Sequence, residues 1–241
     1  MDGPLPASAV NDSTRAARYA VLALASNGVL QVAWLVLRFV FPVGGSARLA
    51  SMEGADQVNR VDHALWTLHW PLRLAGAVLF FMWVSKSFKT AESLGARPVG
   101  HTASSVILGF FTPIANLIQP YRGLRALDDA IDPTSLPQPP PRPAATDDIR
   151  GYREAAGAPE APRVAARPPP LLAWWVLWLF GMIASLWGVA LFDSQVGVAV
   201  VYTLSSLGQA ICAGLAILVV RRIDARLRER ARRLGLLDPQ G

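Results

Sequence analysis

Residues 106–127 read VILGFFTPIANLIQPYRGLRAL, an apolar stretch that polar residues and prolines interrupt. Its most apolar part, residues 106–118, is shorter than the roughly 20 residues that cross a bilayer as a helix. Proline removes a backbone donor and clashes with the preceding turn, so we expect a kink or break at Pro113. Asn116 and Gln119 would then cap the exposed backbone groups or face a polar cavity. The stretch therefore predicts a Pro-broken re-entrant or interfacial segment at about 101–127, with a candidate functional hinge made of Pro113, Asn116, Gln119, Pro120 and Tyr121.

The rest of the chain is apolar enough to require lipid. Hydrophobic residues make up 52% of the 241 positions and gather into nearly uncharged blocks of membrane-crossing length, at about 19–43, 66–84, 171–191 and 196–220. The first block is too long for the apolar region of a cleaved signal peptide. The sequence therefore predicts an all-α integral membrane helix bundle with four transmembrane helices plus the broken segment. The alternative is five transmembrane helices, with residues 101–127 as the third span and the N-terminus outside.

Arginine and lysine indicate the orientation. The formal net charge is +6, and the basic residues lie beside the apolar blocks, where cytoplasmic retention explains them better than nucleic-acid binding does. They lie after the second block, at the end of the hinge stretch and after the fourth block. These residues are Lys86, Lys89, Arg97, Arg122, Arg125 and seven arginines in 221–233. If both flanks of the hinge are cytoplasmic, the hinge cannot cross. We expect a multi-pass protein of the bacterial cytoplasmic (inner) membrane, with the segment 1–18 and the basic tail 221–241 inside.

Residues 133–170 separate two membrane parts, 19–132 and 171–220. They hold eleven of the nineteen prolines, together with alanine, glycine and charged residues. Such a composition cannot bury enough apolar surface to fold. We expect a disordered cytoplasmic linker, and the alternative is a docking site for a protein partner that recognises polyproline.

Charged residues near the membrane give two further candidate sites. Arg38 and Arg73 lie inside predicted spans and could pair with Asp62 or Asp193 in an outer vestibule for an anion, although snorkelling to the interface also explains them. The basic tail could contact anionic lipids at the cytoplasmic face. The candidate lipid contacts are Arg221, Arg222, Arg226, Arg230 and Arg233. The alternative for the tail is that it only fixes the orientation of the chain.

The sequence offers no recognisable catalytic set. His63 and His69 lack the four-residue spacing of a helical metal pair, and Cys212 is the only cysteine. There is no Gly-rich phosphate loop and no nucleophile elbow. We therefore expect a protein that is not an enzyme and needs no cofactor or metal.

Three motifs carry a resemblance to a known family. They are Phe81-Met-Trp83, residues 110–125 (FFTPIANLIQPYRGLR) and residues 171–178 (LLAWWVLW). Together they are similar to the bacterial membrane family called domain of unknown function 4328, over roughly residues 65–215. The chain departs from the family pattern at Thr90, where similar proteins tend to carry asparagine, and in its long Pro-rich insertion. The resemblance implies a fold and a membrane location but no activity.

These observations favour a non-enzymatic scaffold or regulatory membrane module that acts through the linker and the basic tail. The bilayer is its first partner, and a homo-oligomer or a protein bound through the linker is a further one. The alternative is a small oligomeric permease or channel-like protein that uses Pro113, Asn116 and Gln119, since non-helical backbone at membrane depth often lines a wet cavity.

Overall fold

The computed structural model describes residues 6–40, 52–96, 98, 100–112, 115–135, 170–191 and 195–237. Its elements are α1 (Pro6–Val40), α2 (Met52–Ser93), α3 (Ala103–Gly109), η1 (Ala115–Leu117), α4 (Gln119–Ala130), η2 (Pro133–Ser135), α6 (Leu171–Leu191) and α7 (Gln195–Arg233), where η1 and η2 are short 3-10 helices. These residues contain no strand, which confirms the all-α prediction for the part of the chain that is described.

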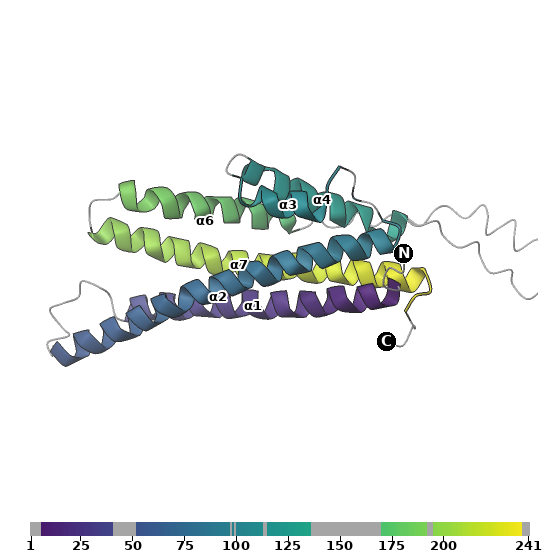
Figure 1. Cartoon of the computed structure of the whole chain (residues 1–241). Coiled ribbons are helices and arrows are strands. Elements are labelled where there is room, and N and C mark those ends of the chain that lie inside the picture. Colours follow the sequence, from purple (N-terminus) through teal and green to yellow (C-terminus); the bar gives the residue numbers. More distant parts are fainter. Residues whose placement is uncertain are drawn as a thin grey trace, which may run out of the picture.

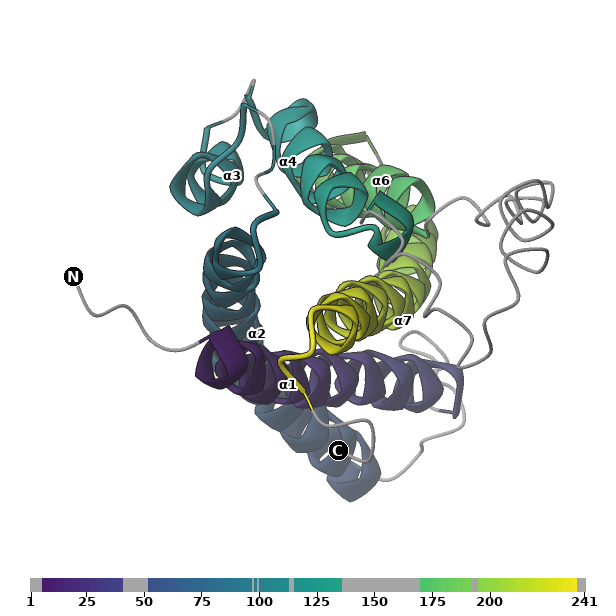
Figure 2. The same ribbon diagram turned by 90° about the vertical axis from the view of Figure 1, so that its right-hand side faces the viewer.

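Four long helices form the body of the protein as two helical hairpins, α1 with α2 and α6 with α7 (Figure 1). α1 packs along both α2 and α7, and α6 packs along α7. In the end-on view of Figure 2, the shorter α3 and α4 complete the arrangement on the side of α2 and α6. α1 and α7 thus join the two hairpins to each other.

Three of the long helices extend beyond the predicted spans. α1 begins at Pro6 instead of residue 19, α2 covers Met52–Ser93 instead of 66–84, and α7 continues beyond the predicted span 196–220 to Arg233. The residues from 52 to 65, which lie outside the predicted spans, are helical. They are polar but contain no proline and only one glycine, so their polarity argues against lipid contact and not against a helix.

The described helices have the length and surface that a bilayer requires. Three stretches are long and apolar enough to cross it, Ala7–Leu37, His63–Ser93 and Thr203–Arg233, whereas Leu171–Gly181 of α6 is a shorter apolar stretch. Large apolar side chains on these helices are exposed on the outside of the bundle, among them Leu22, Val29, Leu74, Phe180 and Leu204. Such surfaces suit contact with lipid chains. By length and composition, three of the described helices could therefore cross a membrane.

Polar contacts close the end of the bundle at which both termini lie (Figure 1). The hydroxyl of Thr90 on α2 donates to the carbonyl oxygen of Ala9 on α1 at 2.9 Å. The hydroxyl of Thr14 on α1 donates to Oδ1 of Asp224 on α7, also at 2.9 Å. Thr90 is buried, so the threonine that departs from the family pattern serves as a contact between α1 and α2.

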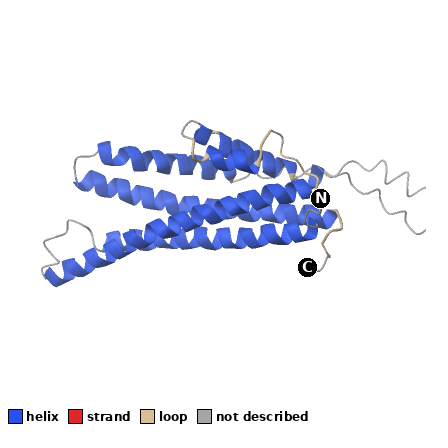
Figure 3. Cartoon of the chain, in the orientation of Figure 1, coloured by secondary structure: helices blue, strands red, loops and turns tan. Residues whose placement is uncertain are grey.

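α3 and α4 form a short helical hairpin beside α2 and α6 (Figure 3). A capping box starts α3, since the Thr102 hydroxyl accepts a hydrogen bond from the Ser105 N–H and the Ser105 hydroxyl accepts one from the Thr102 N–H. The two helices approach closely at Gly123 of α4, where an added Cβ would overlap Cγ2 of Val106. Glycine at this position therefore allows α4 to pack onto α3.

The chain contacts the same residue of α7 before and after the hairpin. Nε of Arg230 donates to the carbonyl oxygen of Leu94, the residue that follows α2, at 3.3 Å. Nη1 of the same side chain donates to the carbonyl oxygen of Ala130, the last residue of α4, also at 3.3 Å. Because one guanidinium contacts both points, residues 101–127 turn back within the bundle instead of running along its whole length.

Candidate functional site

Aromatic side chains from α2, the α3–α4 hairpin and α6 meet in what we call the aromatic cluster. The ring centroid of Phe110 lies 5.3 Å from that of Phe81 and 5.9 Å from that of Trp175. Phe80 and Trp174 add a direct contact between α2 and α6, with their ring centroids 5.9 Å apart. The cluster draws on the hinge stretch, on the Trp-Trp motif and on the aromatic end of the second predicted span. The structure therefore brings together the three motifs that carry the family resemblance.

A cavity of about 310 Å³ lies beside this cluster, between α1, α2, α6 and α7. Its volume is at the lower end of the range found for small-molecule sites, roughly 300 to 1,000 Å³. Most of its wall is apolar, and Asn27, Arg73 and Gln209 contribute the strongly polar side chains. The aromatic part of the wall consists of Phe80, Phe81, Phe110, Phe111, Trp174 and Trp178.

Polar residues near the cavity come in pairs that are four positions apart on their helices. These pairs, which we call the polar belt, are Asn27 and Gln31 on α1, His69 and Arg73 on α2, and Ser205 and Gln209 on α7. The four-residue spacing places both members of a pair on one face of the helix. Nε2 of Gln31 donates to Oε1 of Gln209 at 3.0 Å and lies 3.3 Å from Nδ1 of His69. The polar belt thus links α1, α2 and α7 through polar side chains.

Two members of the belt keep hydrogen-bonding capacity at the cavity. Nη1 of Arg73 lies 3.4 Å from Nε2 of His69, and no described carboxylate forms an ion pair with this arginine. The Arg73 side chain is exposed on the bundle and also lines the cavity, so it lies at the cavity mouth. The buried Oδ1 of Asn27 has no hydrogen-bond partner within the described part of the chain.

Of the four residues of the predicted outer vestibule, only Arg73 has a described side chain. The side chains of Arg38 and Asp62, and the whole of Asp193, lie outside the described residues. Pairing of either arginine with these aspartates therefore stays a prediction. The structure instead places Arg73 against His69 and at the mouth of the cavity.

The predicted hinge forms the turn of the α3–α4 hairpin. Pro113 lies outside the described residues. Asn116 is buried in η1, and its backbone N–H donates to the carbonyl oxygen of Thr112 at 2.7 Å. Nε1 of Trp175 donates to the carbonyl oxygen of Leu117 at 3.0 Å, so a tryptophan of α6 holds the turn in place.

The remaining hinge residues begin α4. Gln119 and Pro120 are its first two residues, and Ile118 occupies the N-cap position without a side-chain hydrogen bond. The cap that we considered for the polar hinge residues is therefore absent from the N-terminus of α4. Proline in the first turn reduces the need for such a cap because it has no N–H. The Tyr121 hydroxyl accepts a hydrogen bond from Nη1 of Arg125 at 3.3 Å, and neither Asn116 nor Gln119 lines the cavity.

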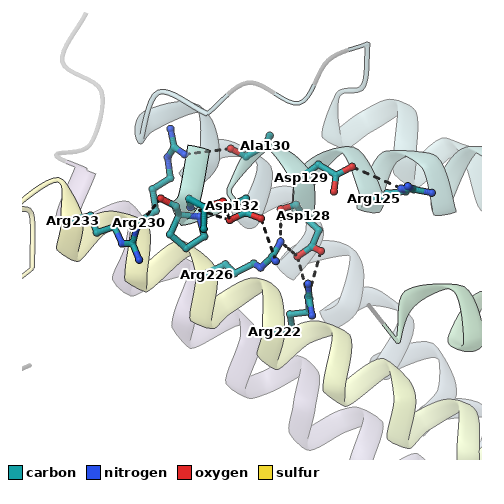
Figure 4. Close-up of polar contacts among 11 residues, drawn as sticks. Arg125, Asp128, Asp129, Ala130, Asp132, Arg222, Arg226, Arg230 and Arg233 are labelled. Carbon is teal, nitrogen blue, oxygen red and sulfur yellow. Dashed lines mark hydrogen bonds and ion pairs between the residues drawn. The ribbon is translucent and has the colours of Figure 1, made fainter. Parts of the chain in front are cut away.

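A second polar site joins α4 and η2 to α7, and we call it the arginine latch (Figure 4). Nη1 of Arg226 lies 2.9 Å from Oδ1 of Asp128, and Nε of Arg222 lies 3.3 Å from Oδ2 of the same carboxylate. Nη2 of Arg226 also pairs with Asp132 at 3.5 Å. The Asp128 side chain is only 5% exposed, so these ion pairs are shielded from solvent. The latch therefore fixes the C-terminal end of the hairpin on α7.

The environment of Asp132 favours its charged form. Partial burial alone would raise its pKa, but hydrogen bonds from the N–H and hydroxyl of Thr134, followed by the charges of Arg226 and Arg222, outweigh burial. The pKa of Asp132 is consequently below its ordinary value. A carboxylate with a lowered pKa adds stability above the pKa that it has in the unfolded chain, and this contribution is lost as the pH falls through the folded-state pKa.

Four of the five arginines that we predicted to contact anionic lipid bind within the chain. Arg222 and Arg226 belong to the latch, Arg230 holds both ends of the hairpin, and Arg233 donates to a backbone carbonyl of η2 at 2.9 Å. Arg221 is exposed. The basic tail is therefore an element of the tertiary structure, and its contact with lipid stays a prediction.

Sequence reasoning missed the polar belt and the latch. The belt had a readable signal, because Asn27 with Gln31 and Ser205 with Gln209 are polar pairs at helical spacing inside apolar blocks. The latch had no local signal, because Arg222 and Arg226 lie 94 and 98 positions after Asp128. Only the folded arrangement of α4 on α7 brings these residues together.

Comparison with known proteins agrees with the motifs that meet in the aromatic cluster. The model of the family described as a domain of unknown function, number 4328, matches residues 45–225, which is more than half of the chain. No curated protein and no solved structure matches this chain. The chain belongs to the domain of unknown function 4328 family.

Proposed function

We propose that this chain is a non-enzymatic regulatory module of the bacterial cytoplasmic membrane that acts through its Pro-rich segment, residues 136–169. The arginine latch carries the proposal. It clamps α4 and the following Asp132, which lead through η2 into this segment, onto the end of α7. A partner that binds the segment would therefore act on a fixed point of the helix bundle.

The proposed topology has α1, α2, α6 and α7 crossing the membrane with both termini in the cytoplasm. The α3–α4 hairpin is re-entrant and returns to the cytoplasmic side. Support comes from Arg230, which bonds to the chain before and after the hairpin, and from the arginines of 221–233, which favour the cytoplasm. Irregular backbone is tolerated at membrane depth where protein covers it, and Trp175 bonds to the turn.

The hairpin also offers a route of communication. Phe110 and Phe111 near its turn line the cavity, while Asp128 at its other end belongs to the latch. A change in the filling of the cavity would displace the hairpin and so alter the position of η2 and the segment that follows. The proposed regulation is this coupling between the cavity and the segment that follows η2.

The test uses the full chain in its own membranes, with a photo-crosslinking amino acid at Ala155 inside the segment. We expect a discrete crosslinked partner that disappears when 136–169 is replaced by a Gly-Ser segment of equal length. Asp128→Asn should reduce the crosslink, whereas Asp129→Asn should leave it unchanged, because Asp129 is 70% exposed and lies outside the latch. The absence of any partner-specific crosslink, or an equal loss in both variants, would refute the proposal.

The permease that the hinge suggested has weaker geometric support. Asn116 and Gln119 do not line the cavity, whose polar side chains come instead from α1, α2 and α7. Solute flux through the hinge residues therefore stays a prediction from the sequence.

A further inference from the structure

We propose that the cavity between α1, α2, α6 and α7 binds a single-chain amphipathic anion. Its carboxylate or phosphate head would lie at Arg73, and its apolar body would lie against the aromatic cluster. The inference rests on the lining of the cavity alone and does not require a partner for residues 136–169.

The chemistry of Arg73 selects the head group. Guanidinium carries five N–H donors and no acceptor, and its planar fork matches a carboxylate or a phosphate. The described contact of this side chain is with one ring nitrogen of His69, at 3.4 Å. A cation at membrane depth is costly without an opposite charge. An anion at the cavity mouth would supply that charge and occupy the remaining donors.

The inner wall selects the body of the ligand. Phe80, Phe110, Trp174 and Trp178 offer aromatic faces and edges to an apolar chain. Arg73 and Phe80 are seven residues apart on α2, so the axial distance from the head position to the cluster is about 10 Å at 1.5 Å per residue. The small volume of the cavity favours one chain over the two chains of a phospholipid.

Two glycines provide a matched pair of variants. Gly76 lines the cavity, and a Cβ added there meets no atom within 4 Å, so a larger side chain would enter the empty space. Gly208 on α7 is equally open but is not among the residues that line the cavity. Gly76→Leu should therefore fill the site, and Gly208→Leu should leave it open.

The experiment uses the purified full chain in phosphatidylcholine nanodiscs. The probe is 10-bromodecanoate, whose bromine quenches tryptophan fluorescence on contact, and the competitors are decanoate, decyl phosphate and decanol. We expect saturable quenching, with both anions competing at least tenfold more strongly than decanol. Gly76→Leu should abolish the saturable part of the quenching and Gly208→Leu should preserve it.

Charge variants test the head group separately. Arg73→Gln should weaken competition by both anions at least tenfold and leave decanol unchanged, while Arg73→Lys should restore much of the anion preference. Arg60→Gln, at an exposed position of the same helix that is not part of the cavity wall, should behave as the unmodified protein.

Three results would overturn the inference. One is competition by decanol as strong as that by decanoate. Another is an equal loss of quenching in the Gly76→Leu and Gly208→Leu variants. The third is a phospholipid that copurifies with the chain and is displaced by Gly76→Leu, with no competition from either single-chain anion.

Discussion

Replacing Asp128 by asparagine should release α4 from α7 without unfolding the long helices. The carboxylate is 5% exposed and receives Arg222 at 3.3 Å and Arg226 at 2.9 Å, whose side chains are 25% and 16% exposed. Breaking a fully buried ion pair by removing one partner costs about 3–5 kcal/mol. Because both arginines retain some contact with solvent, and asparagine keeps one acceptor oxygen, we expect a loss of about 2–4 kcal/mol.

Hydrogen exchange followed by mass spectrometry measures this loss locally. If α4 opens as a unit, a loss of about 2–4 kcal/mol should accelerate exchange of the amides from Tyr121 to Ala130 by roughly 30- to 900-fold. Exchange in the centres of α1 and α7 should change little. The control is Asp129→Asn, whose exposed ion pair with Arg125 contributes at most about 0.5 kcal/mol. Unchanged exchange in Asp128→Asn, or equal acceleration in the control, would refute the assigned role of the latch.

Three further outcomes follow from the hairpin and its surroundings. Gly123→Ala should destabilise the packing of α4 on α3 by about 1–3 kcal/mol, because the new Cβ overlaps Val106. Thermal melting should show this loss and its partial rescue by Val106→Ala, and a Gly123→Ala melt identical to that of the unmodified chain would contradict the close approach. Trp175→Phe should lower the stability of the hairpin turn by about 1 kcal/mol through loss of the hydrogen bond to the Leu117 carbonyl. Proteolysis after residues 112–119 should then be faster, and unchanged cleavage would count against this role. The lowered pKa of Asp132 predicts that its contribution to stability is present at neutral pH and is lost in acid as the carboxylate becomes protonated. Asp132→Asn should therefore flatten the fall in the free energy of unfolding below about pH 4, and an unchanged fall would show that the group does not contribute.

The helical character and the break within residues 106–127 could be predicted from the sequence for physical reasons. The apolar blocks had the length of a membrane helix, and the prolines and polar residues of 106–127 interrupted a segment too short to cross. The ends of the helices could not be predicted in the same way. Hydropathy reports contact with lipid, whereas the polar turns of α1 from Pro6 and of α2 from Met52 are helical beyond any apolar block.

The candidate site was predictable only in part. The aromatic residues were marked by the family resemblance, and Arg73 by its charge inside a predicted span. The amides of Asn27 and Gln209 were overlooked because uncharged polar side chains are common in membrane helices as packing contacts. Asp128 and Arg226 lie in separate predicted segments, and nothing in the sequence indicates that they pair. Arg226 was instead predicted as a contact with anionic lipid, whereas the structure pairs it with Asp128. Long-range pairing of this kind depends on the tertiary fold.

The most direct test of the account is the side of the membrane on which the two ends of the hairpin lie. Single cysteines at Ser93 and Asp129, both exposed, and at Ser194 between α6 and α7 would be introduced into a Cys212→Ala background. They would then be treated with a membrane-impermeant maleimide in intact cells and after permeabilisation. We expect the cysteines at 93 and 129 both to be shielded until the membrane is opened, and the one at 194 to be labelled in intact cells. Labelling of the cysteine at 93 but not of that at 129 would show that residues 101–127 cross the membrane and would contradict the re-entrant hairpin.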